Sequence, residues 1–250
     1  MTPTPLTIVI PTLNEAAQIA ECVRHVSWAG EVIVVDGGST DGTADRARDA
    51  GARVLLAPGS TIAGQRNLGI AQAAHEWIFA LDADERVPPE LAAEVDRVVR
   101  APAHQAYSVK RRNYLNGRVV TGGHWGRDWV VRLFRRDRRY LERHVHESLE
   151  PVPDTVALTQ ELVHVPYRDL AHHVQKTLNW SRLGAEELAA RGRRAGWSDL
   201  MLRPAMRFFR DLILRGGARH GVAGWADAGL AAVGVFTKYL FLWDRNRRDA

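Results

Sequence analysis

Cysteine is nearly absent, since the chain of 250 residues contains a single one, Cys22. A disulfide within the chain is therefore impossible, and a zinc site built from several cysteines is excluded. Cys22 falls on the apolar face of a predicted helix, which favours a buried thiol.

Long uncharged apolar runs are also missing. No stretch of about 18 residues lacks a charge, as a membrane-spanning helix would require, and the nearest candidate, 222–243, contains Asp227 and Lys238. Residues 1–5 carry no basic side chain, and the apolar run after them is too short for a signal peptide. We therefore expect a cytoplasmic protein.

Charge and composition indicate a globular protein with anionic partners. The chain is 46% hydrophobic and 25% charged, which argues against disorder. Its formal net charge is +5, and arginine is concentrated in 108–143 and 191–219. Nucleotide phosphates, nucleic acid or an anionic membrane surface would suit this excess.

Strands and helices alternate in the first part of the chain. Short apolar runs at 6–10, 31–35, 53–56 and 76–81 predict strands, and each run is followed by turn residues and a helical pattern. The first helix is expected to be capped by Asn14 and to extend to about His25. This alternation predicts an α/β fold with a mostly parallel sheet and helices on both faces.

The later part of the chain has a different pattern. Further strands are expected at 107–112, 130–136 and 161–165, and the chain after Pro166 is predicted to be helical. The expected domains are therefore a catalytic domain, 1–166, and a helical C-terminal region, 167–250. The catalytic domain divides into a nucleotide-binding half, 1–100, and an acceptor half, 101–166.

Three carboxylates follow predicted strands: Asp36 after the second strand, and Asp82 and Asp84 after the fourth. Ligands of open α/β sheets bind beyond the carboxyl ends of the strands. If strand geometry continues through Asp84, the side chains of Asp82 and Asp84 point the same way. A divalent cation that bridges carboxylate and diphosphate oxygens would offset their repulsion, although a loop without a ligand is an alternative.

Four motifs occur in a fixed order: Ile10-Pro11-Thr12-Leu13-Asn14-Glu15, Val34-Val35-Asp36-Gly37-Gly38-Ser39-Thr40-Asp41-Gly42-Thr43, Gly64-Gln65-Arg66-Asn67-Leu68-Gly69 and Leu81-Asp82-Ala83-Asp84-Glu85. Together they resemble the inverting family 2 glycosyltransferases, which have the GT-A nucleotide-sugar fold. The resemblance is strong to residue 90 and looser beyond it.

The resemblance implies a donor site for a UDP-sugar. Its expected residues are Pro11, Asn14, Glu15, Asp36, Gly38, Arg66 and Asp82. Asp36 would contact the base and Asp82 the ribose and diphosphate, while Asp84 would ligate Mg²⁺ or Mn²⁺. From the residues alone, the glycines beside Gly38 allow close backbone approach, and Arg66 is either an anion ligand or a solvated charge.

An inverting transfer needs a base that removes the acceptor proton. We predict Glu147 as this base, with His146 supporting it, because some branches of the resembled family carry His-Glu at this point in the motif order. A surface strand edge is the alternative. His164 is predicted as a further metal contact because many GT-A enzymes have a late histidine, and a hydrogen-bonded core residue is its alternative.

Two residues are assigned to the acceptor or its phosphate. Trp125 lies in a Trp-rich loop whose flat rings suit sugars, with core packing as an equal alternative. Arg132 fits the resemblance, and arginine can bind phosphate in a bidentate manner. A zinc site of His144, His146 and His164 is a weaker alternative, because no fourth ligand lies nearby.

The C-terminal region contains an amphipathic helix, predicted at 198–215, and an apolar helix, predicted at 225–243 and followed by arginines. A basic face beside an apolar face suits a membrane interface, and packing against the catalytic domain is the alternative. We expect peripheral attachment to the inner face of the membrane.

The layout as a whole resembles the lipopolysaccharide core β-1,4-glucosyltransferase branch, although His220-Gly221 stands where that branch commonly has Asp-Gly. The implied reaction moves glucose or another hexose from a UDP-sugar onto a lipid-linked saccharide. Transfer onto a polyprenyl phosphate is one alternative. A basic nucleic-acid-binding protein and a nucleotidyltransferase are others, but the motifs typical of these two are missing. We expect no nucleic-acid partner.

Overall fold

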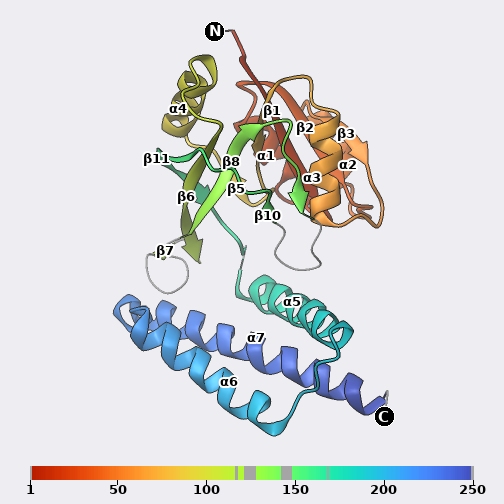
Figure 1. The fold of residues 1–250 in the computed structure, drawn as a ribbon, viewed down its shortest axis with the longest axis vertical. Coiled ribbons are helices and arrows are strands. Elements are labelled where there is room, and N and C mark those ends of the chain that lie inside the picture. The colour runs from red at the N-terminus through yellow and green to blue at the C-terminus, as the bar shows by residue number, and fades with distance from the viewer. Residues whose placement is uncertain (1, 116–117, 121–127, 142–147, 168, 249–250) are drawn as a thin grey trace. The chain divides into compact units, whose positions relative to one another are not determined.

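The computed structural model describes residues 2–115, 118–120, 128–141, 148–167 and 169–248 (Figure 1). The chain divides into two compact units. Unit 1 comprises Met1–Arg111 and Trp129–His164, and unit 2 comprises Arg112–Asp128 and Val165–Ala250.

Unit 1 is built on one curled sheet flanked by helices. The strands of this sheet within unit 1 are β1 (Thr4–Thr12), β2 (Ala29–Asp36), β3 (Arg53–Leu56), β4 (Trp77–Ala80), β5 (Glu85–Arg86), β6 (Ala106–Leu115, which continues into unit 2), β8 (Trp129–Arg135) and β11 (Thr155–His164). The strands β9 (Tyr140–Leu141) and β10 (Ser148–Leu149) form a separate antiparallel pair. Its helices are α1 (Ile19–His25), α2 (Thr43–Asp49), α3 (Ile62–Ala71) and α4 (Pro89–Arg100).

The strand order of the sheet is β3-β2-β1-β4-β8-β6-β11-β5. The first four strands are parallel. The β4–β8, β6–β8 and β11–β5 pairs are antiparallel. The alternating first part of the chain therefore forms the parallel half of the sheet, and the later strands extend it. The predicted α/β fold class is confirmed.

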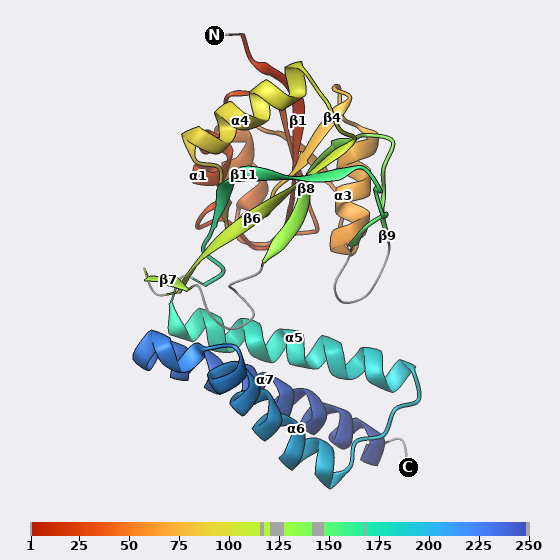
Figure 2. The same ribbon diagram turned by 60° about the vertical axis from the view of Figure 1, so that its left-hand side comes forward.

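Hydrophobic side chains alternate between the two faces of the central strands, as the two-residue repeat requires. Ile8 and Ile10 of β1 contribute to the core beneath α1, α2 and α4, whereas Val9 contributes to the core beneath α3. Figure 2 shows α1 and α4 on one side of the sheet and α3 on the other. Cys22 is fully buried in the first of these cores, as predicted.

Two local expectations were wrong. The first helix begins at Ile19, and Asn14 does not cap it but lies in a left-handed conformation with φ of 58°. The asparagine side chain instead bonds to the neighbouring loop. Strand β4 ends at Ala80, so strand geometry does not continue through Asp82 to Asp84.

Unit 2 is mainly helical. It contains the strand β7 (Arg118–Val120), which pairs with the end of β6, and then α5 (Leu170–Ala190), α6 (Trp197–Phe209), η2 (Arg210–Leu214), η3 (Gly217–His220) and α7 (Gly221–Arg248). η2 is a π-helical turn that continues α6. Both α5 and α6 pack on α7 (Figures 1 and 2).

Small residues permit the close approach of η3 to α7. A Cβ added to Gly224 would collide with the carbonyl oxygen of Gly217. Farther along α7, Tyr239 and Leu242 pack with Ala185 of α5 in a small apolar core. Among the described residues, none of the helices combines the length and apolarity that a membrane span requires.

Candidate active site

The loop after β2 holds a buried carboxylate with one oxygen that has no hydrogen-bond partner in the described part of the chain. Asp36 is 1% exposed, and its Oδ1 accepts hydrogen bonds from the backbone N–H groups of Gly38 (2.8 Å) and Ser39 (2.6 Å). Gly38 has φ of 103°, a conformation that favours glycine. Asp36 Oδ2 is buried and has no hydrogen-bond partner in the described part of the chain. A buried polar atom without a partner is unusual in a folded protein and marks Asp36 as a candidate acceptor for a ligand.

The loop after β1 is fastened to this loop by polar contacts. The N–H of Asn14 donates to Ser39 Oγ (2.8 Å), and Asn14 Oδ1 accepts from the N–H of Thr40 (3.0 Å). The N–H of Glu15 donates to Thr43 Oγ1 (2.8 Å). Asn14 and Glu15, both predicted to line the nucleotide site, thus lie against the loop that carries Asp36. The third residue predicted from this segment, Pro11, is partly exposed near the end of β1.

Helix α3 contacts both sides of the sheet edge through two consecutive residues. Gln65 Oε1 accepts from the N–H of Thr12 (3.1 Å), and a Cβ at Gly37 would collide with Gln65 Nε2. The next residue, Arg66, forms an ion pair with Asp82 Oδ1. The loops after β2 and β4 therefore lie on either side of β1 and are connected through one helix.

The acidic segment after β4 is a tight turn held by arginines. The N–H of Glu85 donates to the carbonyl of Asp82 (3.0 Å), and the N–H of Asp82 donates to Glu85 Oε2 (2.9 Å). Arg132 Nη2 lies 2.5 Å from both Asp82 Oδ2 and Glu85 Oε1. Arg111 Nη1 lies 3.5 Å from the same Glu85 oxygen. The side chain of Asp82 is thus fixed by Arg66 on one oxygen and Arg132 on the other.

The two acids of this turn differ in the direction of their pKa shifts. Burial alone would raise the pKa of Asp82, but Arg132 and Arg66 outweigh it and hold that pKa well below its usual range. Burial raises the pKa of Glu85, which is fully enclosed, and the charge of Asp82 adds to this shift. The pKa of Arg132 is raised by its two acidic partners despite burial. Asp82 therefore stays ionised, and Glu85 is the first of the pair to accept a proton.

Asp84 and His164 meet because β5 pairs with β11. The pairing sets His164 opposite Glu85, and His164 Nε2 lies 3.6 Å from Asp84 Oδ1. Both side chains are largely buried. Two ligands of one small divalent cation are each about 2.0–2.2 Å from it, so this separation is close to the spacing that a shared cation needs. The pair fits a Mg²⁺ or Mn²⁺ site that is completed by diphosphate or water oxygens.

No group of three or more histidine, cysteine or acidic side chains gathers as a metal site in the described ranges. Three predicted site residues, Trp125, His146 and Glu147, lie outside the described residues, as does His144 of the zinc alternative. Arg132, predicted to contact the acceptor or a phosphate, is 4% exposed and lies between Asp82 and Glu85.

Gln65 and Glu85 were assigned no role from the sequence, although both belong to the four ordered motifs. Each is buried and polar, Glu85 at 0% and Gln65 at 3% exposure. The available signal was position: Glu85 directly follows Asp82-Ala83-Asp84, and Gln65 directly precedes Arg66. Buried polar side chains of this kind are retained where hydrogen bonds compensate their burial.

Comparison with known proteins identifies the family. The model of "Glycosyl transferase family 2" matches residues 7–151, which include all four motifs and the acidic turn. The chain is a family 2 glycosyltransferase. The predicted family and its GT-A fold are thereby confirmed.

This glycosyltransferase has a full-length curated relative. It is 32% identical to the lipopolysaccharide core biosynthesis glycosyltransferase LpsC of Rhizobium meliloti, over 98% of this chain and 94% of the relative. An uncharacterized glycosyltransferase of Rickettsia felis is 26% identical over 92% of this chain and 86% of that protein. Among solved structures, glucosyl-3-phosphoglycerate synthase of Mycobacterium tuberculosis with Mn²⁺, UDP and glucosyl-3-phosphoglycerate is 26% identical, covers 44% of each chain and has a TM-score of 0.37.

Proposed function

We propose that this glycosyltransferase moves a hexose from a UDP-sugar, with inversion, onto a hydroxyl of a lipid-linked saccharide. One observation carries the donor assignment. Asp36 and the Asp82 turn follow the two strands that flank β1, where the chain order across the sheet reverses, and α3 ties the two sides together. Open α/β sheets bind nucleotides at such a reversal.

The donor would be held by groups from both sides of β1. Oδ2 of Asp36, which has no hydrogen-bond partner among the described residues, would accept a hydrogen bond from the N3–H of uracil. Asp82, kept ionised by Arg66 and Arg132, would accept hydrogen bonds from the ribose hydroxyls. Pro11, Asn14, Glu15 and the backbone at Gly38 would enclose the nucleotide.

Asp84 and His164 would hold Mg²⁺ or Mn²⁺ beside the diphosphate, on the support of their 3.6 Å separation. When bound, the cation supplies positive charge that stabilises the departing diphosphate.

The acceptor side rests on residues outside the described ranges. Glu147 would remove the proton from the acceptor hydroxyl as its oxygen bonds to the anomeric carbon and the bond from that carbon to the diphosphate oxygen breaks. His146 would support Glu147, and Trp125 would contact a sugar ring. Arg132 would contribute to phosphate binding indirectly, because it stabilises the turn that carries Asp82 and Asp84.

The acceptor class is supported by relatedness over the full chain. LpsC is named for lipopolysaccharide core biosynthesis and aligns with 98% of this chain. We therefore propose a lipopolysaccharide core or another lipid-linked saccharide as acceptor, glucose or another hexose as the transferred sugar, and action at the inner face of the membrane.

A donor panel tests the proposal. UDP-glucose, UDP-galactose, GDP-mannose and ADP-glucose are incubated with the protein, with and without Mn²⁺, and nucleotide release and thermal stabilisation are measured. We expect stabilisation by a UDP-sugar that increases with Mn²⁺, and Asp84→Asn should abolish the increase. Asp45→Asn, at a side chain 81% exposed, is the matched control and should behave as the unchanged protein. Equal responses to all four donors would refute a UDP site.

The base is tested separately. Glu147→Gln should stop transfer to a core-saccharide acceptor and leave UDP binding intact. Lost UDP binding would remove Glu147 from the role of base. Near-normal turnover would favour an acceptor that is already an anion, such as a polyprenyl phosphate.

A further inference from the structure

Helix α6 with its π-helical continuation η2 has an inverted distribution of side chains. Asp199 and Asp211 are buried, Asp211 at 2% exposure. Met206 is 70% exposed and Leu214 is 81% exposed. A helix on the surface of a water-soluble domain normally buries its apolar face and exposes its acids. The outward face of this segment is therefore built for contact with something apolar.

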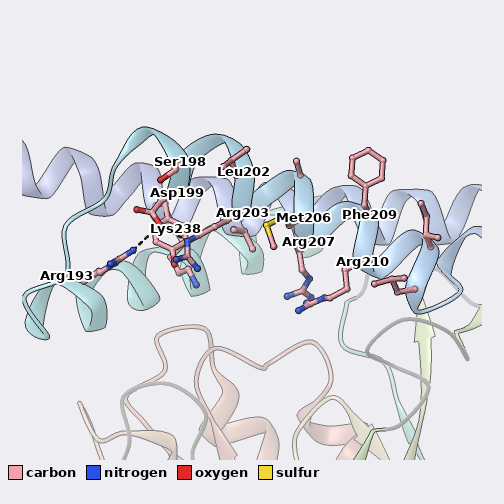
Figure 3. A pocket seen from close by; sticks show the side chains of 15 residues that line it. Arg193, Ser198, Asp199, Leu202, Arg203, Met206, Arg207, Phe209, Arg210 and Lys238 are labelled. Atoms are coloured by element: carbon pink, nitrogen blue, oxygen red, sulfur yellow. Dashed lines mark hydrogen bonds and ion pairs between the residues drawn. The ribbon is translucent and has the colours of Figure 1, made fainter.

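Exposed apolar side chains run along this segment, and we call a stripe of four of them, together with the residue that follows its end, the apolar ridge. It consists of Leu202, Met206, Phe209, Ile213 and Leu214. The first four recur at helical spacings of four, three and four residues, so they share one side of the segment. Figure 3 shows Leu202 and Phe209 projecting away from the side on which Arg207 and Arg210 lie.

A row of arginines, the basic flank, runs beside the ridge: Arg203, Arg207 and Arg210. Arg203 Nε pairs with Asp199 at 2.6 Å, Arg207 pairs with Asp211, and Arg210 Nε lies 3.2 Å from Asp211. The buried acids thus hold the guanidinium groups of these arginines in place.

The basic flank and the apolar ridge both line a groove of about 1030 Å³ between α6–η2 and α7, which is also lined by Arg193 and Lys238. Five basic side chains line the groove, and Asp199 is the acidic residue among its lining. Asp211 pairs with two of the five basic residues. Positive charge therefore remains in excess. The pKa of Lys238 is lowered, by burial first and then by repulsion from Arg203 and Arg207, which is the response expected in a positive field.

We propose that the apolar ridge and the basic flank dock unit 2 onto an anionic phospholipid surface, with the ridge among the acyl chains and the arginines at the lipid phosphates. Long apolar side chains bordered by arginine are the composition of interfacial helices. Arginine also matches phosphate oxygens in geometry and charge.

Charge decides between this occupant and a second copy of the chain. An antiparallel two-fold dimer through the ridge would bring the two basic flanks side by side, where like charges repel, and a parallel one would leave each flank without a negative partner across the interface. An anionic lipid surface instead attracts each basic side chain that reaches it. The docking proposal rests on the proposed function only in that the acceptor is lipid-linked. The residues of the ridge and the flank are separate from those of the donor site.

Flotation with vesicles tests the docking. The full chain is mixed with phosphatidylglycerol–phosphatidylethanolamine vesicles or with phosphatidylcholine vesicles, at low and high salt. We expect flotation with the anionic vesicles that weakens at high salt. Met206→Glu and Leu214→Glu should each weaken it roughly tenfold or more, because a charge replaces an apolar side chain at the interface. Leu56→Glu, at an exposed apolar residue of unit 1, is the control and should float as the unchanged chain.

The two proposals fail in different ways in this experiment. Asp84→Asn should float normally while it loses its Mn²⁺ response, and Met206→Glu should keep UDP-sugar binding in solution while it loses flotation. Normal flotation of both ridge variants, or equal flotation with both vesicle types, would overturn the docking proposal. Circular dichroism confirms that each variant is folded.

A thiol label at the ridge tests whether the protein itself covers this face. Met206→Cys introduces an accessible thiol, and the unchanged chain is the blank because Cys22 is fully buried. We expect rapid labelling in solution and slow labelling on anionic vesicles. Slow labelling without vesicles would show that unit 1 or a second copy occupies the ridge, and it would overturn the proposal.

Discussion

Both units contain buried acids that pair with arginines, but the arginines are buried in unit 1 and exposed in unit 2. In unit 1, Arg66 and Arg132 are each 4% exposed and fix Asp82. Arg132 also pairs with the fully buried Glu85. In unit 2, Arg203 and Arg210 are about half exposed while their partners, Asp199 and Asp211, are buried. The first arrangement fixes a carboxylate, whereas the second fixes guanidinium groups at the surface.

The difference separates two uses of the same ion pair. A fully enclosed pair loses hydration on both partners and depends on exact geometry, so it serves to position a group and contributes little net stability. A pair with a buried acid and an exposed arginine presents positive charge to an external partner. Unit 1 accordingly positions Asp82 for a ligand, and unit 2 presents its arginines beside apolar side chains.

The largest effect is expected when the enclosed network is broken. Arg132→Met would leave Asp82 with one cationic partner and would remove the closest cation from Glu85, because Arg111 is 3.5 Å away. Loss of one partner of a buried pair costs about 3–5 kcal/mol of unfolding free energy. Urea denaturation followed by fluorescence and circular dichroism measures the loss.

The matched control for this change is Arg48→Met, which removes an exposed pair with Asp45. Exposed pairs contribute about 0–1 kcal/mol. Similar losses for the two variants would contradict the distinction between enclosed and surface networks.

The second effect concerns a ligand rather than stability. Asp36→Asn can retain the hydrogen bonds from Gly38 and Ser39 through its amide oxygen. Its amide NH₂ group would then take the position of Oδ2, the oxygen without a partner. A donor would then face the N3–H of uracil. Because a hydrogen bond to a charged group contributes about 1.5–3 kcal/mol, UDP affinity should fall by roughly one to two orders of magnitude. Calorimetric titration measures it, and unchanged affinity would exclude Asp36 from the base site.

Acid should affect the acidic turn of unit 1 and the buried acids of unit 2 differently. The pKa of Asp211 is lowered because Arg207 and Arg210 outweigh the effect of burial, and that of Asp199 is lowered first by the N–H of Gly196. Their stabilisation is present above the unfolded pKa of about 3.9 and is lost as pH falls through the folded values. In the acidic turn the lowered pKa of Asp82 has the same sign, but the raised pKa of Glu85 has the reverse sign and opposes it.

The segment α6–η2 should therefore lose protection before the acidic turn as the pH is lowered. Hydrogen exchange, corrected for the intrinsic rate at each pH, compares α6 with the N–H groups of Asp82 and Glu85. Earlier loss of protection in the acidic turn would contradict the assignment of these shifts.

The smallest effect is expected at the apolar ridge in the absence of lipid. Met206→Ser removes a side chain that is 70% exposed, and substitutions at such positions change unfolding free energy by about 0.5 kcal/mol or less. Thermal unfolding in solution measures it. A large loss would show that the ridge packs against protein and would remove the contrast between the units.

The parallel half of the fold could be predicted from the sequence because its signals are local. The apolar runs that form β1, β2 and β4 are short and end in turn residues, so their order and direction follow from pattern alone. The four motifs placed Asp36, Asp82 and Asp84 at strand ends. Family membership followed from the same motifs and was confirmed by comparison.

The contacts that define the site could not be predicted because they join distant segments. Arg132 and His164 reach the acidic turn only through the antiparallel strands β8 and β11, and no local pattern specifies that pairing. The strand register likewise decides that His164 lies opposite Glu85. The helix cap expected at Asn14 failed because its side chain bonds to the loop across the sheet edge rather than to its own helix.

One helix sets how sequence changes can be tolerated around the nucleotide site. Gln65 and Arg66 are adjacent on α3, and they serve the loops after β1 and β4 respectively. A residue inserted between Ile62 and Gln65 would rotate both side chains by about 100° and would disrupt the two loops together. Insertions before Thr61, in the exposed turn at Gly59, would leave α3 unrotated. Length variation among related chains should therefore collect in that turn and spare the first turn of α3.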